Sequence, residues 1–565
     1  MNGGLTGGVS GGVSAPVTAR KAASLIVLRD SPRGPEVLLL RRADKPGDQN
    51  SGATVFPGGL IDAADAAFGG AGLGGLDDAA ASALLGLAEG GLAFWAGALR
   101  ECFEECGLLF ATAPNGAFAA LDSRDADELM TLRRALHRGE IDFAALCKQL
   151  GVTPAADALA YHSHWVTPLG MPKIFDTRFF IAIAPPGQSA SHDATELVDL
   201  LWLTPAEAVD PARGLKLLNV TELTLKALGQ FGSAGAALAA ARAQTVVPRI
   251  QPRIARNASG RAVVNPADWA YAEVGRLDPA GRGDVRADLT PGEPRWLSPR
   301  VLRITADNGS MMTGPGTNSY FIGAGDDWAL LDPGPDDAAH VRALLAQAPG
   351  RITRILATHT HKDHSPAAAA IFEATRAPRH GRVANFPEWQ DESFVPEQVL
   401  TDGDRLALAD GISLRVIHTP GHASNHLCYL LEQEKLLFTG DHLMQGSTVV
   451  INPPDGDMAQ YLRSLERLLD EDIEWLAPGH GFLIDAPHAV VRKTIAHRLA
   501  REAKVVAGLA ALTRCSEAEL VATVYADTPL RLHAMALRSL RAHLDKLVAE
   551  GRVAQRDGQW QRQAR

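Results

Sequence analysis

Runs of apolar residues divide the chain into stretches that predict different kinds of structure. Near the start, residues 22–28 and 36–41 are apolar runs of strand length. Between about 298 and 490, short apolar runs alternate with longer helical stretches, which is the pattern of an α/β domain. From 491 onward a helical period dominates and ends in a predicted hairpin around Asp557-Gly558.

The 565 residues are too many for one hydrophobic core, so several domains are expected. Composition marks two further segments, a Gly/Ser/Val-rich start and a Pro/Gly/Arg/Asp-rich stretch after about 245 that predicts a linker. The predicted organisation is a disordered tail (1–19), a first α/β domain (20–244), a linker (245–297), a second α/β domain (298–490) and a helical C-terminal domain (491–565).

Charge is unevenly distributed along the chain. The net charge is −10, but residues 491–565 hold 14 Lys and Arg against 7 Asp and Glu, a local excess of +7. The five cysteines are scattered and odd in number, which predicts free thiols in a reducing compartment. No apolar run approaches the length of a membrane span, and the start lacks the apolar core of a signal peptide. We therefore expect a cytoplasmic protein with no membrane partner.

A dense cluster of histidines is the strongest chemical signal. His359, His361, Asp363 and His364 follow the apolar run 352–357, so they are expected in the loop at the carboxyl end of a strand. Three more candidates each lie in a glycine-containing loop after an apolar run: His422, Asp441 and His480. Imidazoles and carboxylates are ligands that zinc prefers, and a site with two metals and a bridging carboxylate needs about this many.

This ordered set resembles the metallo-β-lactamase superfamily. The resemblance implies an αββα sandwich and a dinuclear zinc site that activates water. It implies that His359, His361 and His422 hold one metal, that Asp363, His364 and His480 hold the other, and that Asp441 bridges them. Asp332, in the segment Leu330-Leu331-Asp332-Pro333-Gly334, matches a supporting aspartate of the family. Asp363 is expected to orient the attacking hydroxide and to act as a base.

A second chemical signal lies on a predicted helix in the first α/β domain. Residues 100–108 read as a helix that Gly107 closes, and Glu101, Glu104 and Glu105 share one of its faces. Like charges at this spacing destabilise a helix unless a cation neutralises them. A hard divalent cation held by oxygen ligands is the natural partner.

Residues 59–108 resemble the Nudix box, with Asp65 in the place of its first glutamate and a long Gly/Ala-rich insertion before Arg100. Together with Trp165-Val166-Thr167-Pro168, the insertion resembles the coenzyme A diphosphatase-like branch. The resemblance implies an α/β/α sandwich that hydrolyses a diphosphate of a nucleoside or coenzyme A type. It implies a Mg²⁺ or Mn²⁺ site formed by Arg100, Glu101, Glu104 and Glu105. Glu196 is a further candidate carboxylate for this site.

The C-terminal pattern predicts a winged helix. Helical stretches at 496–512 and 533–549 flank a short helix capped by Ser516, and a hairpin follows. With the segment Thr494–Glu502, this region resembles β-lactamase-like endoribonucleases, which join a metallo-β-lactamase domain to a winged helix. A winged helix can bind nucleic acid, or it can serve packing and dimerisation.

The leading functional prediction is a metal-dependent hydrolase that cleaves RNA phosphodiesters, fused to a Nudix-type diphosphate hydrolase. The alternatives are a thioester hydrolase, glyoxalase II-like or acyl-CoA-related, and a scaffold or nucleic-acid-binding protein with little catalysis. The expected partners are RNA or a small anionic thioester, with a homodimer as one expected assembly. The sequence names no substrate-binding residue.

Overall fold

The structure is a computed structural model that describes residues 18–44, 51–70, 73–191, 197–446 and 448–563. The chain forms two compact units, one of residues 1–254 with 280–282 and one of residues 255–279 with 283–565. Nearly all of the predicted tail lies outside the described residues. Within the described ranges, no helix is both long and apolar enough to cross a membrane.

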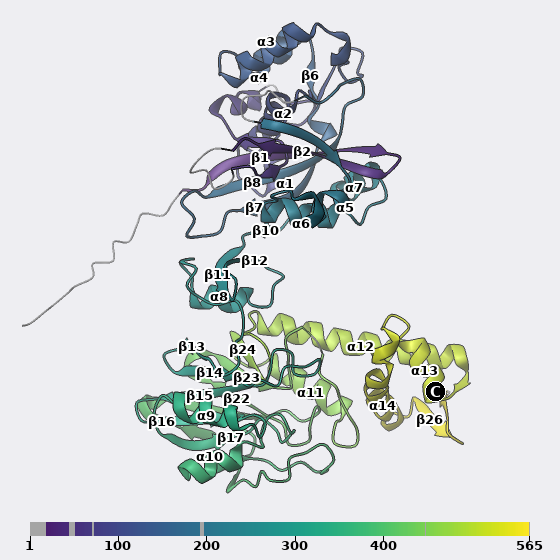
Figure 1. Cartoon of the computed structure of the whole chain (residues 1–565). Coiled ribbons are helices and arrows are strands. Elements are labelled where there is room, and N and C mark those ends of the chain that lie inside the picture. The colour runs from purple at the N-terminus through teal and green to yellow at the C-terminus, as the bar shows by residue number, and fades with distance from the viewer. Residues whose placement is uncertain (1–17, 45–50, 71–72, 192–196, 447, 564–565) are drawn as a thin grey trace, which may run out of the picture. The chain divides into compact units, whose positions relative to one another are not determined.

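The first unit is built on one mixed sheet of eight strands (Figure 1). Its strands are β1 (Arg20–Ser31), β2 (Gly34–Arg42), β3 (Thr54–Val55), β4 (Gly58–Leu60), β7 (Ala160–Val166), β8 (Phe175–Ile183), β9 (Leu197–Leu203) and β10 (Arg249–Ile250). The order is β10-β7-β8-β1-β2-β3, with β4 beside β1 and β9 beside β2. The chain turns between β1 and β2 with Gly34 at φ 109°, and both strands contain the apolar runs 22–28 and 36–41 of the sequence. A separate pair, β5 (Ala111–Thr112) with β6 (Thr153–Pro154), lies outside this sheet.

Helices cover both faces of this sheet, which confirms the predicted α/β/α sandwich. On one face, α2 (Leu92–Cys106) inserts Trp95, Leu99 and Phe103 into a core with β1 and β8. On the other face, Leu225 and Leu238 belong to a second core. The remaining α-helices of this unit are α1 (Asp78–Leu85), α3 (Ala126–His137), α4 (Phe143–Leu150), α5 (Pro205–Val209), α6 (Asn219–Leu228) and α7 (Ala234–Arg242).

The second unit contains two sheets packed face to face. The first consists of β13 (Pro294–Ser298), β14 (Val301–Thr305), β15 (Asn318–Ala324), β16 (Asp327–Leu331), β17 (Ile352–Leu356), β18 (Arg379–Gly381) and β19 (Gln398–Val399). The second consists of β20 (Arg405–Ala407), β21 (Ser413–His418), β22 (Leu427–Leu431), β23 (Leu436–Gly440) and β24 (Trp475–Pro478). Tyr320 and Ile322 of one sheet meet Val416 and Phe438 of the other in a fully buried core.

Helices lie outside both sheets, so the predicted αββα sandwich is confirmed (Figure 1). Leu344 and Ile371 lie in the core outside the first sheet, and Tyr461 and Leu465 lie in the core outside the second. These helices are α9 (Ala338–Gln347), α10 (Ala368–Thr375), α11 (Met458–Leu468) and the start of α12 (Pro487–Leu512).

The segment predicted as a linker carries regular structure. It contains β11 (Arg253–Asn257), β12 (Gly260–Val264) and α8 (Tyr271–Leu277). Glu273 of α8 is fully buried, and its carboxylate accepts hydrogen bonds from Arg303 and from the backbone N–H of Leu483. Composition hid this because Pro, Gly and charged residues dominate the segment, yet Val264, Ala270 and Val274 form a small core with Phe482, and the ion pair of Glu273 with Arg303 adds to it.

The C-terminal part is the predicted winged helix. α12, α13 (Glu517–Val524) and α14 (His533–Ala549) enclose a core that includes Leu509, Leu540 and Trp560. β25 (Arg514–Cys515), β26 (Val553–Arg556) and β27 (Gln559–Arg562) form a small sheet, with the β26–β27 hairpin turning at Asp557-Gly558. α12 is a single helix of 26 residues, so the predicted boundary between residues 490 and 491 falls inside it. Its start at Pro487 suits proline, which tolerates the first helical turn.

Candidate functional site

The histidine-rich loop begins where two parallel strands end. β16 and β17 run side by side, and Asp332 directly after β16 adopts a left-handed φ of 48°. Its carboxylate accepts hydrogen bonds from the Thr358 N–H at 2.7 Å, the Thr358 hydroxyl at 2.8 Å and His364 Nδ1 at 3.0 Å. These three hydrogen bonds show how Asp332 can support the site. They connect the histidine-rich loop to the end of β16 and orient the ring of His364.

His359, His361 and His422 form the first group of candidate ligands, with donor atoms within 4.8 Å of one another. His361 Nδ1 lies 2.9 Å from His359 Nε2 and 3.0 Å from His422 Nε2. The ring of His422 is oriented by a hydrogen bond on the side away from His361, since its Nδ1 donates to the carbonyl oxygen of Val450 at 2.8 Å. Burial and the neighbouring imidazoles lower the pKa of His361 to about 3. Neutral imidazoles are the form that binds a metal.

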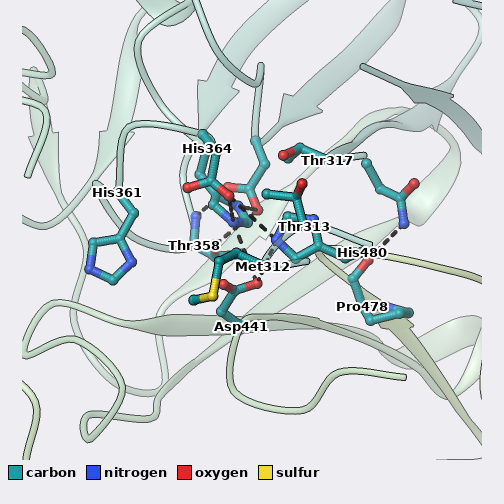
Figure 2. Close-up of polar contacts among 12 residues, drawn as sticks. Met312, Thr313, Thr317, Thr358, His361, His364, Asp441, Pro478 and His480 are labelled. Atoms are coloured by element: carbon teal, nitrogen blue, oxygen red, sulfur yellow. Dashed lines mark hydrogen bonds and ion pairs between the residues drawn. The ribbon is translucent and has the colours of Figure 1, made fainter. Parts of the chain in front are cut away.

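Asp363, His364, Asp441 and His480 form the second group, also within 4.8 Å. Figure 2 shows His364, Asp441 and His480 of this group. Asp441 Oδ1 lies 3.4 Å from His364 Nε2 and 3.2 Å from His480 Nε2. Its other oxygen, Oδ2, lies 3.7 Å from His422 Nε2, so Asp441 faces both groups. His480 Nε2 also lies 3.4 Å from Asp363 Oδ2.

The donor atoms of this second group fit a divalent metal. His364 Nε2, Asp441 Oδ1 and His480 Nε2 are buried, and among the described residues they have no hydrogen-bond partner. Burial opposes protonation of His480, but Asp441 and Asp363 outweigh it and raise its pKa to about 9. This pair of carboxylates attracts positive charge into a buried space, which is what a cation site requires. Nitrogen and carboxylate oxygen are also the donors that zinc takes.

Small residues allow the loops to converge. A Cβ on Gly479 would lie 2.8 Å from His364 Cε1, and a Cβ on Gly440 would lie 2.5 Å from the Thr358 hydroxyl oxygen. The His480 loop is also held by Asn318, whose side-chain amide donates to the carbonyl oxygens of Pro478 and Gly481. Sequence reasoning gave Asn318 no role in the site. Its only signal is a polar residue at the start of a buried apolar strand, β15.

Two exposed apolar turns stand beside the two groups of ligands. The first carries Met311 and Met312, which are 73% and 45% exposed, and Gly316 at its end accepts a hydrogen bond from His480 Nδ1. The second carries Phe386 and Trp389, which are 41% and 52% exposed. It is anchored to the histidine-rich loop, because the N–H of Asp391 donates to the Thr360 carbonyl and Gln390 pairs with His361. We call these four side chains the apolar rim.

The Nudix-like residues also come together, around the guanidinium of Arg100. It donates to both oxygens of Asp65 at 2.9 and 3.0 Å, to Glu101 at 2.9 Å and to Glu104 at 3.1 Å. Asp65, in the place of the first glutamate of the box, therefore orients Arg100. Burial raises the pKa of Glu101 to about 7 and that of Glu105 well above its usual range.

These carboxylates differ from the histidine groups in one respect. Within the described residues no three of them bring donor atoms to within 4.8 Å of one another, and the Arg100 guanidinium bonds both Glu101 and Glu104. Glu105 points elsewhere and accepts the backbone N–H of Gly58 at 2.8 Å. Glu196 lies outside the described residues.

Comparison with known families identifies the class of each domain. The description "Metallo-beta-lactamase superfamily" matches residues 312–480, "NUDT19 Nudix domain" matches 78–217, and "Beta-lactamase associated winged helix domain" matches 516–560. The chain is a hydrolase of the metallo-β-lactamase superfamily with a Nudix domain before it and a winged helix after it. The fold and its His/Asp site imply a divalent metal.

Two curated relatives, each at least 30% identical, support the assignment. The chain is 34% identical to the "Beta-lactamase-like protein 2 homolog" of Drosophila melanogaster, over 47% of this chain and 93% of that protein. It is 30% identical to the "Atrochrysone carboxyl ACP thioesterase" of Aspergillus fumigatus, over 41% of this chain and 76% of that protein. A metallo-β-lactamase family protein of Thermus thermophilus, known from its crystal structure, is 24% identical. The match covers 47% of this chain and all of that chain, with a TM-score of 0.41.

Proposed function

We propose that the second unit hydrolyses a thioester at a dinuclear zinc centre. The support for two metals is the division of the donors into two groups with Asp441 between them. His359, His361 and His422 would hold one ion, and Asp363, His364 and His480 the other. Three or four such donors per ion are what zinc takes in catalytic sites, where one position stays open for water.

When bound, two zinc ions would polarise the scissile carbonyl and lower the pKa of the attacking water. Asp363 is the protein group placed to handle the proton. Its side chain is 28% exposed, against 0% for His364 and 4% for His480, so it faces the opening of the site. Burial opposes its ionisation, but His364 and His480 outweigh burial and hold its pKa at about 2. An ionised Asp363 can orient the water and accept its proton.

The proton then has a destination in the reaction. Water forms the new C–O bond, the C–S bond breaks, and the proton taken by Asp363 passes to the departing thiolate. The products are a carboxylic acid and a thiol, and no oxidant or reductant is needed.

The apolar rim is the observation that carries the choice of a thioester. Met311, Met312, Phe386 and Trp389 put large exposed apolar side chains on the turns that contact His480 and His361. Exposed apolar patches of this kind mark binding sites for apolar groups. An acyl chain can contact all four side chains of such a rim, whereas RNA would use only the two aromatic rings, by base stacking, and its phosphate backbone gains nothing there. One relative is named as a thioesterase, which also supports a thioester substrate.

RNA cleavage is the second candidate, and the winged helix with its excess positive charge favours it. Several of its basic side chains are already in ion pairs, however. Arg501 and Lys504 both pair with Asp527, and Arg541 pairs with Glu517. Free basic groups bind a phosphate backbone by releasing the cations condensed on it, so arginines that are already paired contribute less.

For the Nudix domain we propose Mg²⁺- or Mn²⁺-dependent hydrolysis of a diphosphate, with Glu101, Glu104 and Glu105 as metal ligands and Arg100 as their organiser. A coenzyme A-type compound connects the two proposals. Hydrolysis of its thioester would release a thiol that still carries a diphosphate, which is the kind of bond a Nudix domain cleaves. The cytoplasmic location and the homodimer stay predictions.

The test is thiol release by the full-length zinc-loaded protein from short-chain and long-chain coenzyme A thioesters, alongside cleavage of a labelled RNA. We expect thiol release from thioesters, with a lower KM for the longer acyl chain. Trp389→Ser should raise KM for the long chain, whereas Trp296→Ser, a similarly exposed tryptophan on the edge strand β13, should not. RNA cleavage without thiol release would reject the thioester proposal.

A further inference from the structure

The helix that enters the winged helix also reaches the loops of the metal centre. Arg498 lies in α12 and is only 3% exposed. Its Nη2 donates to the carbonyl oxygen of Val449, and its Cζ lies 5.3 Å from the ring centroid of Tyr461. Burying a guanidinium costs free energy, and these two contacts offset part of that cost, while Nε has no hydrogen-bond partner among the described residues.

The backbone that Arg498 holds is the backbone that orients His422. Val449 precedes Val450, whose carbonyl oxygen accepts the hydrogen bond from His422 Nδ1 at 2.8 Å. This bond places the proton on Nδ1 and leaves Nε2 to face the site, 3.7 Å from Asp441 Oδ2. A displaced Val450 carbonyl would free the ring of His422 to turn.

Tyr461 supports the same loop from a second side. A Cβ on Gly421, the neighbour of His422, would lie 2.3 Å from the Tyr461 Cα, so α11 and this loop are in direct contact. The Tyr461 hydroxyl donates to the carbonyl oxygen of His442, next to Asp441. Arg498 therefore packs on the side chain that supports the loops of two candidate ligands.

The next turn of α12 faces the winged helix. Arg501 donates to the carbonyl oxygen of Val524 and lies over the ring of Tyr525, with its Cζ 4.3 Å from the ring centroid. Glu502 is buried and accepts hydrogen bonds from Lys546 and Arg552. The segment Thr494–Glu502 thus contacts the metal-site loops at Arg498 and the winged-helix core three and four residues later.

We infer that Arg498 is a positioning residue for the metal centre, which acts through the Val449–Val450 backbone on His422 and so strengthens metal binding by the group of His359, His361 and His422. Partners that orient a metal-bound histidine typically change metal affinity by about 10- to 100-fold. The inference rests on the metal centre of the proposed function and is independent of the substrate.

The test measures metal binding by the full-length protein. The protein is stripped with a chelator and titrated with Zn²⁺ against a chromophoric chelator, and then with Co²⁺ to record its absorption spectrum. Arg498→Met keeps an apolar stem over Tyr461 but removes the donor to Val449. We expect the Kd of this variant for the metal held by His359, His361 and His422 to rise at least about tenfold. Its Co²⁺ absorption spectrum should change as well. Arg498→Lys keeps a positive charge and a hydrogen-bond donor but lacks the planar guanidinium. Its metal affinity should lie between those of the wild type and Arg498→Met.

Arg501→Met is the matched control, because it removes an arginine of the same helix that contacts the winged helix instead. It should bind metal as the wild type does. The inference would be overturned if Arg498→Met had the metal affinity and Co²⁺ spectrum of the wild type. It would also be overturned if Arg501→Met lost as much metal affinity as Arg498→Met. If Arg498→Met does not fold, wild-type affinity in Arg498→Lys overturns it. A wild-type protein that binds no metal would instead reject the proposed dinuclear centre itself.

Discussion

Asp363 is the side chain on which the proposed chemistry depends most. Asp363→Asn keeps the size of the side chain but cannot accept a proton from water. We expect kcat for thiol release to fall by about 10³-fold, since general-base catalysis contributes about 10²- to 10⁴-fold and a metal ligand is weakened as well. Circular dichroism should show an unchanged fold. Retention of most activity would show that another group activates the water.

At the residue scale, the side-chain types showed which residues could bind a metal. His422 and His480 stand in glycine-containing loops after apolar runs, His359 closely follows the run 352–357, and the structure brings their side chains to one place. What holds them could not be predicted. Val450 acts through its carbonyl oxygen and Arg498 through a contact 49 residues away, and neither leaves a mark in the local pattern.

At the scale of elements, α8 shows why a polar segment was predicted as a linker. Glu273→Gln should destabilise the second unit by about 3 kcal/mol, because it leaves the guanidinium of Arg303 buried without its carboxylate. Urea unfolding of the full-length protein measures this. Glu293→Gln is the control, since Glu293 is 54% exposed and 3.6 Å from Arg286. Its loss should be below about 1 kcal/mol. Equal, small losses in both variants would mean that α8 is not needed for stability.

The packing of α14 against α12 should weaken in acid. His543 of α14 is fully buried, and burial together with Arg498 and Lys546 lowers its pKa to about 3, although Glu502 lies 3.9 Å away. In the unfolded chain a histidine takes a proton near pH 6.5. The contribution of neutral His543 is therefore complete above about pH 6.5 and is lost as the pH falls below it, by about 2 kcal/mol at pH 5.

Hydrogen exchange of the α14 amides at pH 7 and pH 5, corrected for the intrinsic rates, reports this loss locally. The protection of α14 should decrease at pH 5 in the wild type. In His543→Leu, which has no proton to gain at this position, the decrease should be smaller. A decrease of the same size in both proteins would assign the acid sensitivity to other groups.

Element order was predictable because the period of apolar positions changes clearly between strands and helices, as in β1, β2 and α14. The extent of α12 was not. Residues 487–495 precede the periodic stretch, and their helix is stabilised by packing of Val491 in the core outside the second sheet. Tertiary contacts of this kind commonly decide where a helix begins.

At the scale of the whole molecule, two hydrolase sites lie in separate compact units. Glu104→Gln should remove Mg²⁺-dependent diphosphatase activity of the first unit and leave thiol release by the second unchanged, since it weakens only the carboxylate set around Arg100. Both activities are measured on the same preparation of full-length protein. Simultaneous loss of both would show that the two sites are coupled.

The central claim is a dinuclear metal centre in the second unit, and elemental analysis of the gently purified full-length protein tests it most directly. Two complete groups of donors, with Asp441 facing both, predict close to two zinc ions per chain. His422→Ala should reduce this number toward one, because it removes a donor from the first group only. A wild-type protein that holds no zinc-class metal after gentle purification would contradict the account.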